Sequence, residues 1–152
     1  MNRILLIEDD EYKCKSILCN LEEHFPSVPV DVERSYHSGL KAIFTAIHDI
    51  IILDMTLPTY DISADEMGGP FRAFAGIEIL NEMKRRKLSP HVVVVTQFDA
   101  FGSGKDIITL VELNMRLEAF APTYLGTVFY NPATSKWREE LISLVKEGDN
   151  RD

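Results

Sequence analysis

Acidic side chains directly follow two of the most apolar runs in the sequence. Asp54 ends the apolar run of IILDMTLP, and Glu8 and Asp9 follow the run ILLI near the start of the chain. A hydroxyl side chain, Thr96, follows a third run, VVVV. Carboxylates that share one pocket repel one another, and a raised pKa or a bound cation relieves the repulsion. Oxygen ligands without His or Cys favour a hard cation such as Mg²⁺, so these acids are candidate ligands of that ion.

The elements that must position these residues alternate along the chain. We expect strands at five short apolar runs: Arg3–Ile7, Val28–Val32, Ile50–Leu53, Val92–Val95 and Leu125–Tyr130. We expect helices where apolar residues recur at helical spacing: Glu11–His24, Ser38–Ile47, Gly76–Arg86, Lys105–Phe120 and Ser135–Lys146. This alternation predicts βαβ units and an α/β fold, a parallel sheet with helices on both faces. Ligands of such sheets bind at the carboxyl ends of the strands, where the acids and Thr96 would meet.

Each of these polar residues also has an ordinary structural interpretation. Asp9 or Asp10 could cap the first helix, since aspartate is a favoured N-cap residue. Thr96 could be a turn residue, and Asp54 could form a turn ahead of Pro58. The functional interpretation depends on finding all of them at corresponding strand ends.

Size and charge limit the classes of function. A chain of 152 residues suits one domain, which we expect at residues 1–148 with a short tail at 149–152. A net charge of −8 argues against direct nucleic-acid binding and against an anionic membrane surface. The N-terminal apolar run is too short for a signal peptide, and no run approaches the length of about 20 residues that a membrane helix needs. We therefore expect a cytoplasmic protein.

The joint pattern of ILLIEDDE before a helix, IIILDMTLP and VVVVT resembles the receiver domain of two-component response regulators. The resemblance covers nearly the whole chain and implies a single doubly wound (βα)5, flavodoxin-like fold with strand order 2-1-3-4-5. It implies that Asp54 is the phosphoacceptor and that Thr96 is the switch hydroxyl. It further implies a Mg²⁺ site in which Asp9 is a direct ligand, Glu8 is a second acid and Thr56 supplies a backbone carbonyl.

The same resemblance implies a role in a bacterial phosphorelay. The phosphoryl donor would be a histidine kinase or a phosphotransfer protein, and the target would be another protein. With no output domain in the chain, the signal would pass through the surface of the fourth helix, fifth strand and fifth helix, which could also form a homodimer. No turnover of a separate substrate is expected, apart from hydrolysis of the domain's own phosphate. A carboxylate attacks another anion only when a cation screens the repulsion, so Mg²⁺ is the expected cofactor.

The chain departs from the receiver pattern at the end of the fifth strand. Receivers carry a lysine there, directly before a proline, whereas this chain reads TVFYNP and has Asn131 in that position. A shift of one residue would place Tyr130 there instead. The position that is usually aromatic holds Val128. An amide brings no charge, so a phosphorylated state would be less well stabilised unless Lys105, Lys136 or Arg72 supplies the missing cation.

Two long insertions, near residues 59–75 and within residues 97–124, follow the third and fourth strands and would lie at the same edge as the acids. They predict a lid or a partner surface there. The departures also leave a second function open, a pseudo-receiver that binds partners without being phosphorylated. A Mg²⁺-dependent phosphatase or nuclease is a third class. It fits less well, because Met55 and Thr56 follow Asp54 where a second aspartate would be needed.

Overall fold

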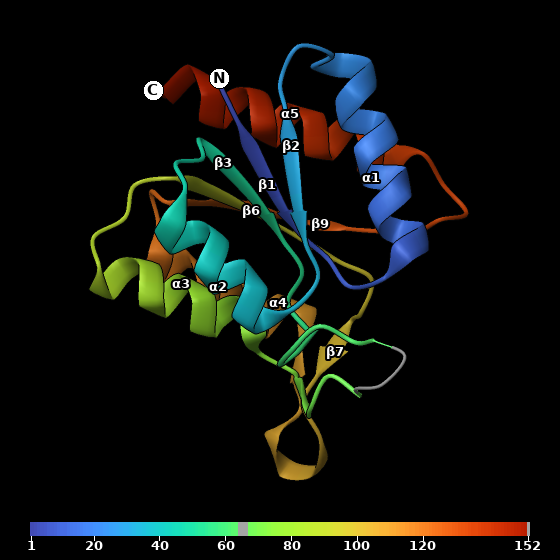
Figure 1. The fold of residues 1–152 in the computed structure, drawn as a ribbon. Helices are drawn as coiled ribbons and strands as arrows, with labels where there is room; N and C mark the ends of the chain where they lie inside the picture. Colours follow the sequence, from blue (N-terminus) through green and yellow to red (C-terminus); the bar gives the residue numbers. More distant parts are fainter. Residues whose placement is uncertain (64–66, 152) are drawn as a thin grey trace.

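A five-stranded parallel sheet forms the centre of the molecule (Figure 1). The computed structural model describes residues 1–63 and 67–151. Its central strands lie in the order β2-β1-β3-β6-β9, which is the predicted order 2-1-3-4-5. They are β1 (Ile4–Ile7), β2 (Val30–Glu33), β3 (Ile50–Leu53), β6 (His91–Thr96) and β9 (Tyr124–Phe129). The strands β1, β3 and β6 are buried along almost their whole length, which explains their unbroken apolar sequences.

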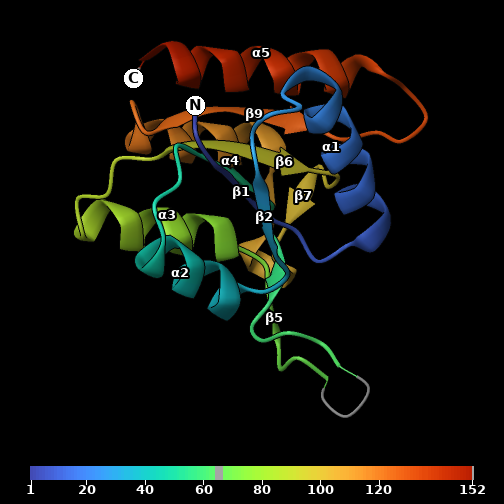
Figure 2. The ribbon, with the colours of Figure 1, turned by 45° about the horizontal axis from the view of Figure 1, so that its top comes forward.

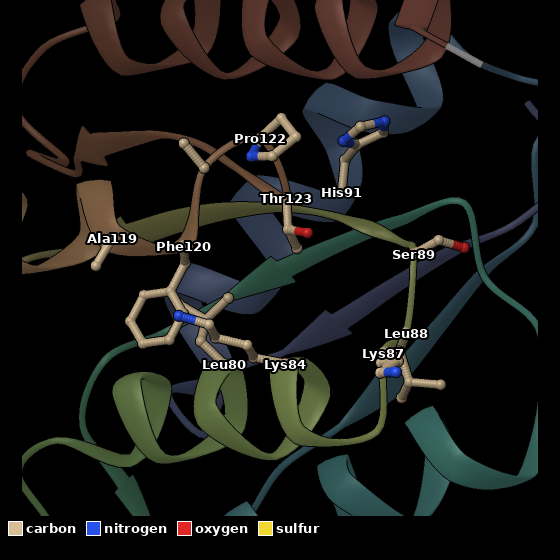
Figure 3. Close-up of a pocket in the computed structure, with 11 residues that line it drawn as sticks. Leu80, Lys84, Lys87, Leu88, Ser89, His91, Ala119, Phe120, Pro122 and Thr123 are labelled. Atoms are coloured by element: carbon tan, nitrogen blue, oxygen red, sulfur yellow. The ribbon is translucent and has the colours of Figure 1, made fainter.

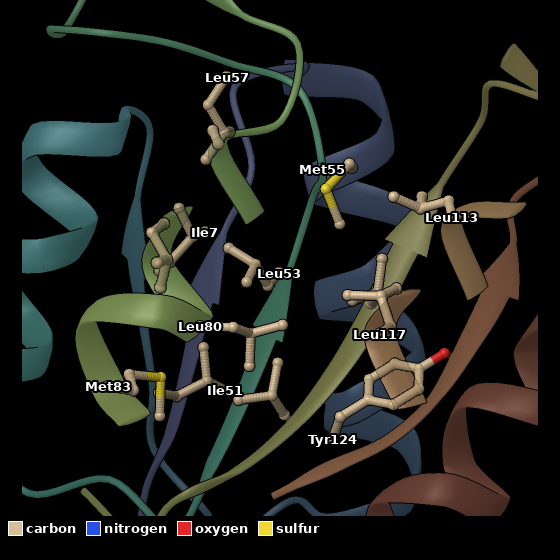
Figure 4. Close-up of a cluster of buried hydrophobic side chains, with 14 of the residues drawn as sticks. Ile7, Ile51, Leu53, Met55, Leu57, Leu80, Met83, Leu113, Leu117 and Tyr124 are labelled. Carbon is tan, nitrogen blue, oxygen red and sulfur yellow. The ribbon is translucent and has the colours of Figure 1, made fainter. Parts of the chain in front are cut away.

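Helices cover both faces of the sheet. One face carries α1 (Glu11–His24) and α5 (Lys136–Arg151), which pack on alternate residues of β1, β3 and β6. The other face carries α2 (Tyr36–Thr45), α3 (Ala75–Arg85) and α4 (Leu110–Leu117). Figure 4 shows the core on this second face, where Leu80 and Met83 of α3 meet Ile51 and Leu53 of β3. No helix in the described ranges combines the length and apolar character that crossing a bilayer requires.

Helix α3 is shifted by one residue from its expected range, and three other helices differ by more at one or both ends. Helix α2 lies two residues earlier than predicted because Ser35 caps it, and Ile47, which was expected in the helix, is 90% exposed beyond its end. Helix α4 begins at Leu110 rather than Lys105, after a 3-10 turn, η1 (Gly104–Asp106). Helix α5 continues to Arg151, so residues 149–151 of the expected tail are helical; Asp152 lies outside the described residues.

Each insertion is associated with a small antiparallel ribbon that the sequence did not predict, and the first ribbon begins just before residue 59. In the first, β4 (Leu57–Pro58) pairs with β5 (Phe71–Arg72); in the second, β7 (Ala100–Phe101) pairs with β8 (Ile108–Thr109). Figure 2 shows the first ribbon extending away from the sheet. Because the insertions follow β3 and β6, both lie at the carboxyl edge of the sheet. A second 3-10 turn, η2 (Glu118–Phe120), connects α4 to β9.

Candidate active site

The strand register brings two of the predicted acids together. Ile7 of β1 pairs with Leu53 of β3, so Glu8 and Asp54 are the next residues on neighbouring strands. The backbone N–H of Asp54 donates to the carbonyl of Ile7 at 3.1 Å, which continues the sheet pairing past the end of β3. Buried parallel strands are rigid, so this register fixes the backbone positions from which the side chains of Glu8 and Asp54 extend.

Glu8, Asp9 and Asp54 form one acidic cluster. Each offers a carboxylate oxygen, and these three atoms lie within 4.8 Å of one another. Glu8 and Asp54 are buried, and Asp9 is partly buried. Burial, and then the nearby charge of Asp54, raise the pKa of Glu8 to about 8 and raise the pKa of Asp9 above its ordinary value. The cluster therefore holds negative charge at an electrostatic cost, as expected for a site that takes a cation.

Lys13 of α1, which was not among the predicted site residues, enters this cluster. The ammonium of Lys13 lies 2.6 Å from Glu8 Oε1 and 3.3 Å from Asp54 Oδ2. It also donates to the backbone carbonyl of Val95 at 2.9 Å. Burial lowers the pKa of Lys13, but the Asp54 and Glu8 carboxylates raise it by more, so its pKa lies above the ordinary value. Lys13 is therefore a buried cation that joins the ends of β1, β3 and β6.

The start of α1 sets the position of Lys13. Asp10 is the N-cap residue, and its Oδ1 accepts a hydrogen bond from the backbone N–H of Lys13 at 2.9 Å. The expected capping role is thus confirmed for Asp10, while Asp9 remains free for the cluster. Lys13 shares the buried stripe of α1 with Ile17 and Leu21 at i+4 and i+8, which points its side chain toward the sheet. That spacing is the sequence signal that could have identified it.

Thr96 and Thr56 also lie near the ends of their strands. Thr96 is fully buried at the end of β6, and its hydroxyl oxygen accepts a hydrogen bond from the backbone N–H of Phe98 at 3.2 Å. Its hydroxyl proton is thus available to another acceptor. The hydroxyl of Thr56 donates to the carbonyl of Ala73 at 3.0 Å and so ties the end of β3 to the first insertion. That the backbone carbonyl of Thr56 binds Mg²⁺ stays a prediction.

The end of β9 does not supply a cation. Asn131 is exposed, and its side-chain oxygen accepts a hydrogen bond from the backbone N–H of Ala133 at 3.0 Å, in a local turn. The neighbouring Tyr130 is buried, and its ring centroid lies 6.0 Å from the Lys13 ammonium and 4.8 Å from the Trp137 ring. Val128 is fully buried in the core. This strand end therefore presents a tyrosine ring beside Lys13.

The three cations considered as replacements lie elsewhere. Arg72 forms an ion pair with a glutamate of α3, and Lys136 pairs with a glutamate one turn further along α5. Lys105 is exposed in the turn η1. Within residues 1–63 and 67–151, the cation that forms an ion pair with Asp54 is Lys13, and none of the three cations considered as replacements does so.

A separate cavity of about 380 Å³ lies at the opposite edge of the sheet. It opens between the end of α3, the start of β6 and the segment that leads into β9 (Figure 3). Its lining includes Lys84 and Lys87 beside the apolar side chains of Leu80 and Phe120, and none of the described residues that line it is an aspartate or a glutamate. This cavity is therefore not part of the acidic cluster.

Comparison with known proteins decides the family. The chain is 30% identical over 149 residues to the Detocs response regulatory protein DtcB of Enterobacter cloacae (strain JD6301), a match that covers 95% of this chain and 99% of that protein. The chain belongs to the receiver domains of two-component response regulators. No family model matches the sequence. The assignment nevertheless agrees with the strand order and with the placement of the acids at the carboxyl edge.

Solved receiver structures share the fold of this receiver. A CheY-like response regulator receiver domain protein from Methanospirillum hungatei JF-1 aligns with a TM-score of 0.62 at 19% identity, covering 100% of this chain and 99% of that one. The response regulator TrrA of Thermotoga maritima, solved in complex with Mg²⁺ and BeF, aligns with a TM-score of 0.55 at 17% identity, over 95% of this chain and 99% of that one. At these identities the likeness establishes the fold.

The acidic cluster of this receiver fits a magnesium ion. All of its donors are oxygens, and Mg²⁺ binds through one or two carboxylates while it keeps several waters. When all three acids are ionised, the ammonium of Lys13 balances one of three negative charges. Two negative charges are left, which is the charge that one divalent cation neutralises. Asp9 and Asp54 are the residues that could hold the ion, with Glu8 beside them.

Proposed function

We propose that this receiver accepts a phosphoryl group on Asp54 in a Mg²⁺-dependent phosphorelay and passes the signal on by protein–protein contact. The donor would be a histidine kinase or a phosphotransfer protein. The observation that supports the proposal best is the convergence of Glu8, Asp9 and Asp54, whose oxygens lie within 4.8 Å of one another at the carboxyl edge of the sheet. An isolated aspartate at a strand end would give no reason to expect transfer chemistry.

In the proposed reaction, an Asp54 oxygen forms a bond to phosphorus while the bond from phosphorus to the donor breaks. With a small acyl phosphate as donor, the leaving group is a carboxylate, so no proton has to be supplied. Bound Mg²⁺ would offset the negative charge that the phosphoryl oxygens and the carboxylates bring together. The buried hydroxyl of Thr96 could then donate to a phosphoryl oxygen, because its hydrogen bond with Phe98 uses the oxygen and not the proton.

Surface features support signalling by contact. On α4, Val111 and Met115 are one turn apart and are 69% and 71% exposed, while Phe129 of β9 is 42% exposed. Apolar side chains that stand exposed together on a small domain often mark an interaction surface. They lie on the elements that correspond to the predicted partner face, on the fourth helix and fifth strand of the receiver.

The test is phosphorylation by a small donor. The protein is incubated with acetyl phosphate, with and without Mg²⁺, and its intact mass is measured over time. We expect the mass of one phosphate to be added only with Mg²⁺, and we expect Asp54→Asn to abolish the addition. Asp99→Asn is a matched control, because this aspartate is exposed in the second insertion. Phosphate uptake by Asp54→Asn would show that another residue is modified.

The second candidate function is a pseudo-receiver that works without phosphorylation. The exposed Asn131, engaged in its own turn, is the observation that favours it. The same experiment distinguishes the two functions. If the wild-type protein gains no phosphate from acetyl phosphate or from phosphoramidate in Mg²⁺, the phosphorylation proposal fails and the pseudo-receiver function is supported.

A further inference from the structure

Lys13 has the geometry of a functional cation. Its side chain is 1% exposed, and its ammonium has acceptors on three different strand ends: Glu8, Asp54 and the carbonyl of Val95. An ammonium has three N–H donors, so every proton has an acceptor. Lysine is almost never fully buried without partners, and here the partners include the phosphoacceptor itself. A role that is only structural would not require contact with Asp54.

In the part of the chain that the structure describes, Lys13 is the cation that forms an ion pair with Asp54. The side chain at position 131 is a neutral amide that faces a local turn. Among the described residues, the ion pairs of Asp54 involve Lys13 alone. A phosphoryl group on Asp54 would therefore find one ammonium at hand, and that ammonium comes from α1 rather than from the end of β9.

We propose that Lys13 is the phosphoryl-binding cation of this receiver, taking over from α1 the task that the neutral residue at the end of β9 cannot perform. The inference depends on the proposed phosphorylation of Asp54. In the unmodified protein, one Lys13 proton points to Asp54 Oδ2 and the other two to Glu8 and Val95. On phosphorylation, the ammonium keeps this proton, and its hydrogen bond shifts from the Asp54 carboxylate to a phosphoryl oxygen, while the other two hydrogen bonds hold the ammonium in place.

The transfer step leaves Lys13 chemically unchanged. An Asp54 oxygen bonds to phosphorus, the bond from phosphorus to the acyl oxygen of the donor breaks, and the leaving carboxylate takes the electron pair. Lys13 keeps all its protons and acts through its charge. Because Val95 directly precedes Thr96, the same ammonium would connect the phosphoryl group to the strand end that carries the switch hydroxyl.

An alternative role for Lys13 is that of a plug, meaning that its ammonium occupies the metal site in place of Mg²⁺. A plug would compete with Mg²⁺, so its removal would strengthen both metal binding and phosphorylation. A phosphoryl-binding cation behaves differently, because its removal leaves the carboxylates free for Mg²⁺ but deprives the phosphoryl group of its donor. Removal of Lys13 is therefore expected to increase phosphorylation of Asp54 in the first case and to decrease it in the second.

The experiment compares Lys13→Met with Lys15→Met. Methionine replaces the buried stem of Lys13 without its charge. Lys15 lies on the same helix but is 73% exposed and pairs with Glu11, so its variant controls for the loss of one positive charge. Three quantities are measured for each protein: the affinity for Mg²⁺ by calorimetry, the binding of beryllofluoride in saturating Mg²⁺ by ¹⁹F NMR, and the rate of phosphate uptake from acetyl phosphate by intact mass. Circular dichroism establishes that each variant is folded.

We expect Lys13→Met to bind Mg²⁺ at least as tightly as the wild type. Beryllofluoride, which mimics a phosphoryl group, should bind about tenfold to a hundredfold more weakly, and phosphate uptake should slow by a similar factor, as for loss of one hydrogen bond from a charged group. Lys15→Met should match the wild type. If Lys13→Met does not fold, Lys13→Gln is judged by the same criteria, since it keeps a polar side chain without the charge.

The possible failures can be told apart. If the wild type takes up phosphate and the Lys13 variant binds beryllofluoride and takes up phosphate as well as the wild type or better, the inference about Lys13 is wrong and the proposed function stands. If the wild type itself binds no beryllofluoride and gains no phosphate, the proposed function fails. Weaker Mg²⁺ binding that fully accounts for the other losses would also overturn the inference, since Lys13 would then act through the metal site.

Discussion

Raising the pH in the absence of divalent metal should destabilise this protein, and Glu8 should be the main cause. Glu8 is 1% exposed, and its pKa in the folded protein is about 8, against an ordinary value of 4.5. Between these two values the unfolded chain has lost the Glu8 proton while the folded protein still holds it. The folded state therefore binds more protons, and its stability must fall as the pH rises through this interval. The contribution is fully present below about pH 4.5 and is lost by pH values above about 8.

The size of the effect follows from proton linkage. One proton held by the folded state and not by the unfolded state changes the free energy of unfolding by about 1.4 kcal/mol per pH unit. Over the whole interval this sums to at most about 5 kcal/mol, and water entering around the charged cluster would reduce it. Asp9 adds a change of the same sign, because burial and Asp54 also raise its pKa. Lys13 adds none below pH 8, since its pKa is raised above its ordinary value of 10.5.

Urea unfolding in EDTA between pH 5.5 and 8.5 measures this effect. Trp137, the single tryptophan, is 2% exposed, so its fluorescence reports the loss of the core. We expect Glu8→Gln to flatten the decline in the free energy of unfolding, because glutamine keeps the shape and has no proton to lose. Glu11→Gln, at a side chain that is 71% exposed, should leave the decline unchanged. Parallel pH profiles for the wild type and Glu8→Gln would refute the reasoning.

Three further outcomes are expected. Mg²⁺ should raise the urea midpoint of the wild type more at pH 8 than at pH 6.5, because a metal ion binds deprotonated carboxylates, and Asp9→Asn should remove most of this stabilisation. Ser35→Ala should lower the free energy of unfolding by about 1 kcal/mol in urea titrations, because Ser35 and Ser38 form a capping box at the start of α2. Leu80→Ala should lower the free energy of unfolding by about 2–5 kcal/mol in the same assay, because this leucine is 1% exposed in the core between α3 and the sheet.

The sheet and the acidic cluster could be predicted from the sequence because their signals are local. Continuous apolar runs identified β1, β3 and β6, and the acids that follow β1 and β3 had to meet once the strands were parallel neighbours. The ends of α4 were harder to predict. Residues 105–109 were expected in this helix because Ile107 fits the apolar spacing of Leu110 and Val111. Residues 104–109 instead form a 3-10 turn and one strand of a ribbon, and Gly102 and Gly104 adopt positive φ angles. Whether such a segment pairs with a neighbour depends on contacts that helical spacing does not encode.

Lys13 was missed for a different reason. A lysine in the first turn of a helix normally faces solvent, and charge alone gives no sign that it is buried. Its helical phase does, because Lys13, Ile17 and Leu21 share one face of α1. The receiver pattern places the phosphate-binding cation at a strand end, so Lys105, Lys136 and Arg72, which lie near strand ends or in loops, were the candidates from the sequence. The structure shows that a helix covering the sheet can supply a charge to the same edge.

Charge balance indicates why the proposed role of Lys13 would matter most after phosphorylation. Before transfer, three ionised carboxylates, one ammonium and one divalent ion would sum to zero. An aspartyl phosphate carries about one more negative charge than the aspartate that it replaces, so the phosphorylated cluster would carry a single net negative charge. Without Lys13 that charge would be two, at a site where Glu8 and Asp54 are buried and repulsion is weakly screened. Loss of the ammonium should therefore weaken the phosphorylated state more than the metal-bound state, which is the difference that beryllofluoride and Mg²⁺ binding would measure.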